Sequence, residues 1–246
     1  MGLESFTYDE INSLDYGMYV TQKTVWDAPK RVVSMIQVAG RNGDLTIDEG
    51  KYENVRVRYT LKCNATTKDE FAEKVKMFRN ELCSRTGYKR LTDTYNQDEY
   101  RMGVFITEFS VTGKFNNTAG VFDVEFNCKP QRFLVSGEWQ TEINTSSATI
   151  TNPTNFSSKP LISFTGTGTL GISDWILTIT GLSSQVLYID CDMMEVYKNT
   201  GGIIEGANSL VSINKNTFPE LVSGVNNITK TSGLTNLKIT PRWWRI

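Results

Sequence analysis

Strict alternation of apolar and polar residues in one segment constrains the fold of this chain most. The apolar positions are Val55, Val57, Tyr59, Leu61 and Cys63, and polar or charged residues stand between them. Successive side chains of a strand point to opposite faces, so this spacing predicts a strand with one buried and one solvated face. The same period recurs at 105–111 and 122–128, which indicates antiparallel sheets.

A single helix is predicted at about residues 67–84. Thr67 and Glu70 have the spacing of a capping box, which satisfies the first free N–H groups of a helix. Four apolar residues follow on one helical face, namely Phe71, Val75, Phe78 and Leu82. We expect this helix to lie against one face of a sheet.

A change in charge density divides the chain into two predicted domains, 1–137 and 138–246. The first segment holds 19 basic and 19 acidic residues, and the second only 7 and 8. Residues 141–158 are rich in Ser, Thr and Asn, which is typical of a loop or flexible junction. Short apolar runs at 161–164, 175–179 and 186–189, separated by turn residues, favour a β-sandwich in the second domain. The predicted fold class is mainly β, with two β-sandwich-like domains, the first carrying one α-helix.

Composition narrows the functional classes. The chain has 246 residues with 26 Lys and Arg, 27 Asp and Glu, and no histidine. Because positive and negative charges balance, the chain has no net positive potential that would attract polyanions. We therefore expect neither nucleic acid nor membrane as a partner. Without histidine, Ser-His-Asp triads and HExxH zinc sites are excluded. A glycosidase using two carboxylates stays open, but no pair stands out. We therefore expect no enzyme activity, no cofactor and no metal.

Two motifs resemble ligand sites but have simpler interpretations. Gly166, Gly168 and Gly171 match a GxGxxG loop, with Asp190 further on, yet the residues after them are strand-like and no helix opens there. Asp190 and Asp192 form only a fragment of a calcium loop, and as solvated charges on one strand face they need no ion. We expect neither a nucleotide site nor a cation site.

The chain start and the cysteines predict a soluble protein made without secretion. Residues after Met1 show no basic and then apolar leader, and no apolar run reaches membrane-spanning length. The four cysteines, Cys63, Cys83, Cys128 and Cys191, are widely spaced. We expect reduced, mostly buried thiols.

Two segments have the composition of partner surfaces. Gly40, Arg41, Asn42, Gly43 and Asp44 form a glycine-flanked turn with a charge at each end. The segment 241–246 holds two Trp and two Arg, residue types that are enriched at interface cores. A last strand docked on the second domain explains that segment equally well.

Several segments, taken in order, resemble the distal tail protein (Dit) family of long-tailed siphophages. The strongest are the GR-x-GDL turn at 40–45 and the GxYEN segment at 50–54. The segments at 13–20 and 29–31 and the Phe126-Asn-Cys-Lys-Pro130 segment also resemble that family, as do residues 160–162, 189–190, 218–226 and the Trp243-Trp244 pair.

This resemblance implies a structural hub at the virion tail tip, assembled in the host cytoplasm. The implied homo-hexamer is a ring closed by the first domain, with a galectin-like second domain pointing outward. Its implied partners are the tail tube protein, the tail-associated protein and receptor-binding components. As candidate assembly interface we take Gly40, Arg41, Asn42, Gly43, Asp44, Arg56 and Arg58, because ring closure brings different surface patches together.

A host-surface carbohydrate-binding module is the alternative function. The aromatic residues that could stack on sugar rings are Trp139, Trp175, Trp243 and Trp244. In a β-sandwich, however, a tryptophan is more often part of the core or of an interface.

Overall fold

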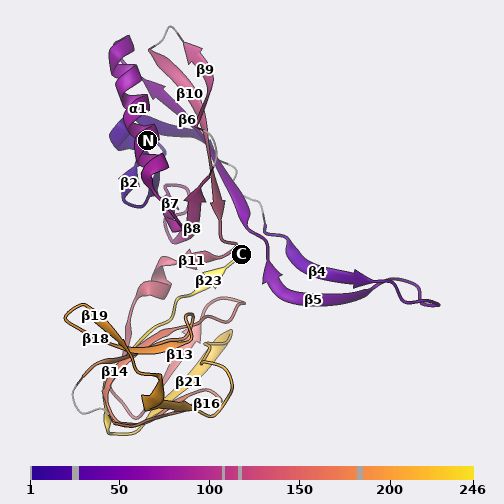
Figure 1. Ribbon diagram of the computed structural model, residues 1–246, viewed down its shortest axis with the longest axis vertical. Helices are drawn as coiled ribbons and strands as arrows, with labels where there is room; N and C mark the ends of the chain where they lie inside the picture. Colours follow the sequence, from indigo (N-terminus) through magenta and orange to yellow (C-terminus); the bar gives the residue numbers. More distant parts are fainter. Residues whose placement is uncertain (1, 24–27, 107–108, 116–117, 182–184) are drawn as a thin grey trace. The chain divides into compact units, whose positions relative to one another are not determined.

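The computed structural model describes residues 2–23, 28–106, 109–115, 118–181 and 185–246. Most of the chain is strand, which confirms the mainly β class (Figure 1). Contacts divide it into two compact units. The first runs to Arg132 and includes Ile246, and the second is Phe133–Arg245.

Most strands of the first unit belong to one sheet. In the order β2-β1-β7-β8-β10-β6-β3, with β9 also paired to β10, they are β2 (Ile11–Asn12), β1 (Phe6–Tyr8), β7 (Lys89–Asp93), β8 (Glu99–Phe105), β10 (Ala119–Cys128), β6 (Val55–Asn64), β3 (Met18–Lys23) and β9 (Ser110–Phe115). The longest pairing joins β6 and β10 over ten residues, from Asn64 and Ala119 to Val55 and Cys128. Both strands alternate between buried and less buried positions, as their sequence period predicts.

The predicted helix is α1 (Lys68–Ser84), and its start is the expected cap. Thr67 Oγ1 accepts a hydrogen bond from the backbone N–H of Glu70 at 3.2 Å. The Glu70 carboxylate reaches back to the N–H of Thr66, at 2.8 Å, rather than to that of Thr67. Phe78 and Leu82 are fully buried, so the apolar face of α1 completes the core of this unit.

Aromatic rings form the centre of that core. Phe6 stacks on Tyr59 with ring centroids 4.8 Å apart, and the edge of Phe126 meets Phe6 at 5.4 Å. Phe78 brings α1 into the same group, 6.2 Å from Phe6. Offset and edge-to-face pairs of this kind add to the stabilisation that burial gives.

The second unit has two sheets. One has the order β12-β22-β14-β17-β18-β19, comprising β12 (Thr141–Ile143), β22 (Leu234–Thr240), β14 (Leu161–Gly166), β17 (Leu187–Asp190), β18 (Glu195–Thr200) and β19 (Ile203–Gly206). The other has the order β13-β21-β15-β16-β20, comprising β13 (Ser147–Asn152), β21 (Gly224–Lys230), β15 (Gly168–Ile172), β16 (Trp175–Ile179) and β20 (Val211–Ile213). Both sheets contribute side chains to one hydrophobic core, which contains Phe164 of β14 and Leu170 of β15.

Short elements complete the described chain. They are the 3₁₀ helices η1 (Ser13–Tyr16), η2 (Val135–Glu138) and η3 (Asn208–Leu210), the strands β4 (Arg31–Ile36) and β5 (Leu45–Tyr52), and the strands β11 (Arg132–Leu134) and β23 (Trp244–Arg245). In the described ranges no helix is both long and apolar enough to span a membrane.

One sequence prediction differs from the structure, and another falls partly outside the described residues. Residues 141–158 are not simply a loop, because β12 and β13 lie within them. Their polar side chains complete hydrogen bonds, for example from the buried Asn152 amide to the carbonyls of the nearby Phe156 and the distant Leu221. The strand predicted at 105–111 includes residues 107 and 108, which lie outside the described ranges; β8 ends at Phe105 and β9 begins at Ser110.

The chain end and the cysteines behave as structural residues. Trp243 is only 6% exposed and belongs to the core of the second unit, and Trp244 stacks on Phe156 at 4.5 Å. The two tryptophans of 241–246 therefore pack against other residues of the chain, and the role of this segment as a partner surface stays a prediction. Cys63, Cys128 and Cys191 are buried free thiols, and burial raises the pKa of Cys128 and of Cys191 to about 12, whereas Cys83 is exposed.

Candidate assembly surfaces

The first unit contains a two-stranded hairpin with exposed apolar side chains, which we call the arm (residues 31–52). It consists of β4, β5 and the turn between them, and these two strands pair only with each other (Figure 1). An isolated two-stranded hairpin is marginally stable in water unless a further strand, a helix or a partner covers it.

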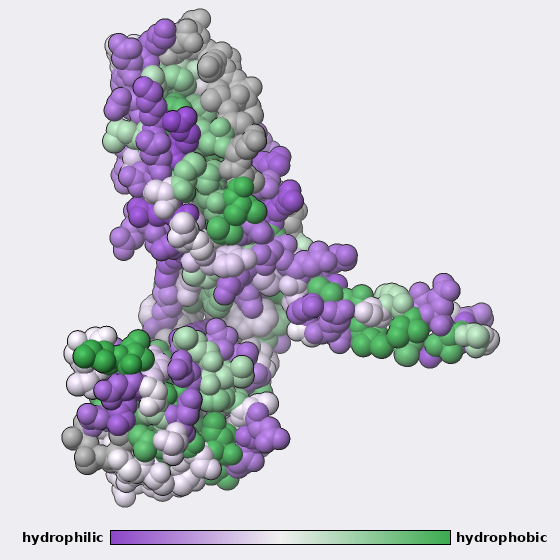
Figure 2. Space-filling view, viewed as in Figure 1, coloured by the Kyte–Doolittle hydropathy of each residue, from purple (hydrophilic) through white to green (hydrophobic). Residues whose placement is uncertain are grey.

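Apolar side chains of the arm face solvent. Ile36 pairs with Leu45 and Ser34 with Ile47, so Ile36, Leu45 and Ile47 share one face. Their exposed fractions are 45%, 41% and 47%, and Met35 on the opposite face is 60% exposed. Figure 2 shows hydrophobic surface along the arm, interspersed with hydrophilic surface. Fully burying one such side chain is worth about 1.5–3 kcal/mol, so covering the arm is strongly favourable.

Ion pairs reinforce the half of the arm next to the body of the unit. Arg31 pairs with Asp48 across the two strands, and Glu49 accepts from Ser34 Oγ at 3.1 Å. The N–H of Gly50 and the Arg31 guanidinium lower the pKa of Asp48 below its ordinary value. These contacts bring polar side chains together at the base and leave the apolar stripe nearer the tip.

The predicted turn residues lie at the tip of the arm, and all five are exposed. Gly40 and Gly43 have φ of 78° and 80°, the left-handed conformation that glycine adopts without strain. Arg41 and Asp44 make no ion pair with any described residue. The tight turn accounts for the glycines, and the two charges are left to face solvent.

Arg56 and Arg58 lie on the solvated face of β6, at the other end of the arm. Both pair with Glu125 of β10, at 3.5 Å and 2.8 Å. Strand β5 has eight residues. A strand of that length spans about 27 Å, so the structure does not bring these arginines together with the tip residues. The predicted interface is therefore two separate charged patches, and the apolar stripe between them was missed. The sequence of β5 carries a signal for that stripe. Leu45 and Ile47 are two residues apart, and residues with this spacing lie on the same face of a strand.

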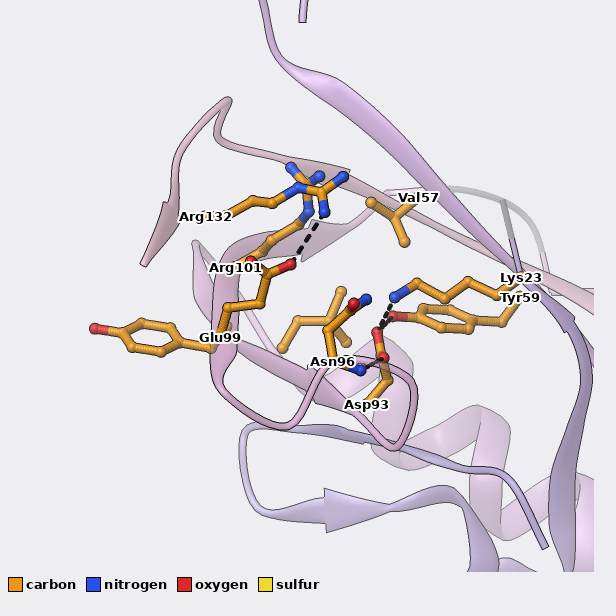
Figure 3. A pocket seen from close by; sticks show the side chains of 10 residues that line it. Lys23, Val57, Tyr59, Asp93, Asn96, Glu99, Arg101 and Arg132 are labelled. Carbon is orange, nitrogen blue, oxygen red and sulfur yellow. Dashed lines mark hydrogen bonds and ion pairs between the residues drawn. The ribbon is translucent and has the colours of Figure 1, made fainter. Parts of the chain in front are cut away.

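A buried polar cluster holds the end of β3, which leads towards the arm. The Lys23 ammonium pairs with the Asp93 carboxylate, which also accepts from the Tyr59 hydroxyl at 2.8 Å (Figure 3). Burial lowers the pKa of Lys23, against the opposing effect of Asp93, and burial raises the pKa of Tyr59 well above its ordinary value.

Two arginines border the same cluster. Arg132 donates to Glu99 at 3.0 Å, and the neighbouring Arg101 has a buried Nη1 that makes no hydrogen bond within the described residues. The cavity between these side chains has a volume of about 20 Å³. That is room for one water molecule rather than for an organic ligand. We therefore interpret this cluster as structural, and the arm as the candidate functional site.

Asp190, which the sequence offered as a cation ligand, has a different partner. Arg242 donates to both of its carboxylate oxygens, at 2.7 Å and 2.8 Å. The matching glycine motif also has a different role, because Gly168–Ile172 forms strand β15. Both motifs thus serve the architecture of the second unit.

Among known proteins, the chain is similar to solved structures but matches no protein by sequence. No protein-family model matches the sequence, and no curated protein matches it either. The Dit protein of phage SPP1, described as a paradigm of the hub adsorption apparatus in phages that infect Gram-positive bacteria, is similar over 100% of both chains, with a TM-score of 0.77 and 13% identity.

Two structures of the phage p2 baseplate in its activated conformation are also similar. The one with strontium has a TM-score of 0.51 at 9% identity, covering 100% of this chain and 99% of that one. The one with calcium has the same score and identity, over 97% and 98%. The chain therefore has, over its whole length, the fold of a Dit baseplate hub protein.

Proposed function

We propose that this chain is a structural hub of a phage tail tip, without enzymatic activity. In this proposal six copies form a ring that joins the tail tube protein to the tail-associated protein and to receptor-binding components, so the protein resides in the virion. Support comes from the fold, which is that of the SPP1 Dit hub, and from the order of the Dit-like sequence segments.

The observation that carries the proposal is the exposed arm. A hairpin with Ile36, Leu45 and Ile47 facing solvent gains stability when another surface covers it. A neighbouring copy of the same chain is the surface available in a homo-oligomer. Contact between an arm and a different patch of the next copy is heterologous, and heterologous contacts close into rings when the rotation per copy permits.

The charged patches add orientation to this contact. Arg41 and Asp44 at the arm tip have opposite charges, and the Arg56, Arg58 and Glu125 group also contains both signs. Complementary charges fix the register of an interface more than its affinity. In the proposed ring, the apolar stripe supplies affinity and the two patches supply register.

Replacing the apolar stripe tests this proposal. The variant Ile36→Ser, Leu45→Ser, Ile47→Ser keeps the strand pairing but removes the apolar surface that an adjacent copy would cover. We expect light scattering to show a fall from the oligomeric mass to that of a single 27.8 kDa chain.

A control variant replaces three apolar residues that are more exposed than those of the arm. Ile203, Ile204 and Val225 of the second unit are exposed by 67%, 66% and 63%, and their joint replacement by serine should leave the oligomer intact. An arm variant that keeps the wild-type mass would refute the role of the arm.

A further inference from the structure

The polar cluster that holds the end of β3 contains one more positive charge than negative charges. Lys23 pairs with Asp93, and Arg132 pairs with Glu99. Arg101 of β8 is the third cation of the cluster, and no ion pair in the described ranges includes it. All five residues belong to the first unit. The cluster therefore carries a surplus positive charge that is centred on Arg101.

The Arg101 guanidinium has a buried donor for which the chain supplies no acceptor. Its Nη1 is buried and makes no hydrogen bond within the described residues. Arg132 lies beside it (Figure 3), and burial together with the charge of Arg132 lowers the pKa of Arg101. A buried charge is costly unless a counter-ion and hydrogen bonds compensate it. The group that completes this cluster must therefore accept a hydrogen bond from Arg101.

The cavity beside Arg101 limits the size of that group. Its volume is about 20 Å³, and Lys23, Asn96, Arg101 and Arg132 are among the residues that line it. Figure 3 shows the Asn96 side chain pointing into this space, between Glu99 and Lys23. An asparagine amide donates N–H groups, as a guanidinium does. A cavity of this volume holds one water molecule or one monatomic anion of similar size, whereas sulfate, phosphate and organic anions are too large.

Charge decides between water and an anion. A water molecule can accept the hydrogen bond from Arg101 Nη1 but leaves the surplus charge in place. A chloride ion accepts the same hydrogen bond and makes the cluster neutral, and hydrogen bonds between charged groups are the stronger kind. The two carboxylates do not exclude a chloride ion, because each is already compensated. Asp93 is bound by Lys23 and by the Tyr59 hydroxyl, and Glu99 is bound by Arg132.

We propose that this cavity binds a chloride ion, which accepts hydrogen bonds from Arg101 and Asn96 and lies next to Arg132. The ion compensates the surplus charge of the cluster. It thereby stabilises β7 and β8, the neighbouring strands that carry Asp93 and Arg101. Binding at this site depends neither on the arm nor on the proposed ring.

Hydrogen exchange of the full chain, in sodium chloride and in sodium gluconate at equal ionic strength, tests the proposal. Gluconate is too large for the cavity, and equal ionic strength keeps the general screening of charges the same. A ligand that binds only the folded state stabilises it by RT ln(1 + [L]/Kd), so chloride at about ten times its Kd should slow exchange in β7 and β8 about tenfold. Equal exchange rates in the two salts throughout a chloride titration would overturn the proposal.

Two matched variants separate the site from general effects of the salts. Arg101→Met keeps an unbranched side chain but removes both the surplus charge and the donor, so β7 and β8 should exchange at the same rate in the two salts. Arg79→Met replaces an exposed arginine of α1 that does not line the cavity, and it should keep the wild-type difference between the salts. A chloride effect that survives in Arg101→Met, or that is lost in Arg79→Met, would count against the site.

Anomalous diffraction from crystals of the wild-type protein grown in sodium bromide locates the ion directly. This measurement keeps the proposal testable if Arg101→Met does not fold. We expect an anomalous peak within hydrogen-bonding distance of Arg101 Nη1. Density there without anomalous signal would identify a water molecule, and an empty cavity would be equally inconsistent with the proposal.

Discussion

One ion pair fixes the end of the chain to the second unit. Asp190 is 4% exposed and accepts two hydrogen bonds from Arg242 as well as the backbone N–H groups of Asp192 and Met193. Burial by itself raises the pKa of Asp190, but these hydrogen bonds outweigh it and lower the pKa below its ordinary value. Arg242 adopts φ of 58°. This conformation is uncommon for a residue with a side chain, and the ion pair helps to hold it there.

This pair predicts a pH dependence of stability. A carboxyl with a lowered pKa in the folded state stabilises the protein above its unfolded pKa, and this contribution is lost as the pH falls through the folded value. Urea denaturation should show stability declining as the pH falls below about 5, with a shallower decline for Asp190→Asn. At pH 7 that variant should be about 2 kcal/mol less stable, because charge-assisted hydrogen bonds are lost. Identical pH profiles for the two proteins would show that Asp190 contributes nothing.

The arginines of β6 provide a second test at the residue scale. Reversing both charges, in Arg56→Glu with Arg58→Glu, places three carboxylates together at Glu125. If this patch sets the register between copies, light scattering should show a smaller assembly than for the wild type. A thermal melt confirms that the variant is folded, and an unchanged assembly mass would exclude the patch from the interface.

At the scale of the elements, the stability of helix α1 depends on its N-terminal cap and on its buried apolar face. Thr67→Ala removes the side-chain acceptor for the N–H of Glu70. This loss should cost about 1 kcal/mol of unfolding free energy. Thr67→Ser keeps the acceptor and should retain most of that stability. Chemical denaturation of the two variants measures the difference, and equal stability would mean that the cap contributes little.

The sequence predicted those elements whose pattern is local. Strand β6 and helix α1 have periods of 2 and 3.6 residues that need no knowledge of partners. The arm was harder to predict, because Leu45 and Ile47 alternate just as the residues of a buried strand do. Only tertiary structure shows that no sheet covers them. Residues 141–158 were misjudged because threonine and asparagine occur both in loops and in strands, where their side chains complete hydrogen bonds.

The site residues show the same division. The turn at 40–44 could be located because glycine marks left-handed positions. The Lys23 and Asp93 pair could not, because the two residues are 70 positions apart in the sequence. Likewise the partner of Asp190 lies 52 residues away, and no local pattern indicates it.

On the scale of the whole molecule, each unit has its own hydrophobic core. The first core is built around Phe6, Phe78 and Phe126, and the second around Phe164 and Leu170. The arm belongs to neither core. In the proposed hub, this division lets the first unit supply assembly contacts without drawing on the core of the second.

The most direct test of the proposed hub is the mass of the purified wild-type protein by light scattering, with negative-stain images of the same sample. We predict a particle with six times the chain mass of 27.8 kDa that appears as a closed six-fold ring. A single-chain mass at micromolar concentration, or open filaments in place of rings, would contradict the account.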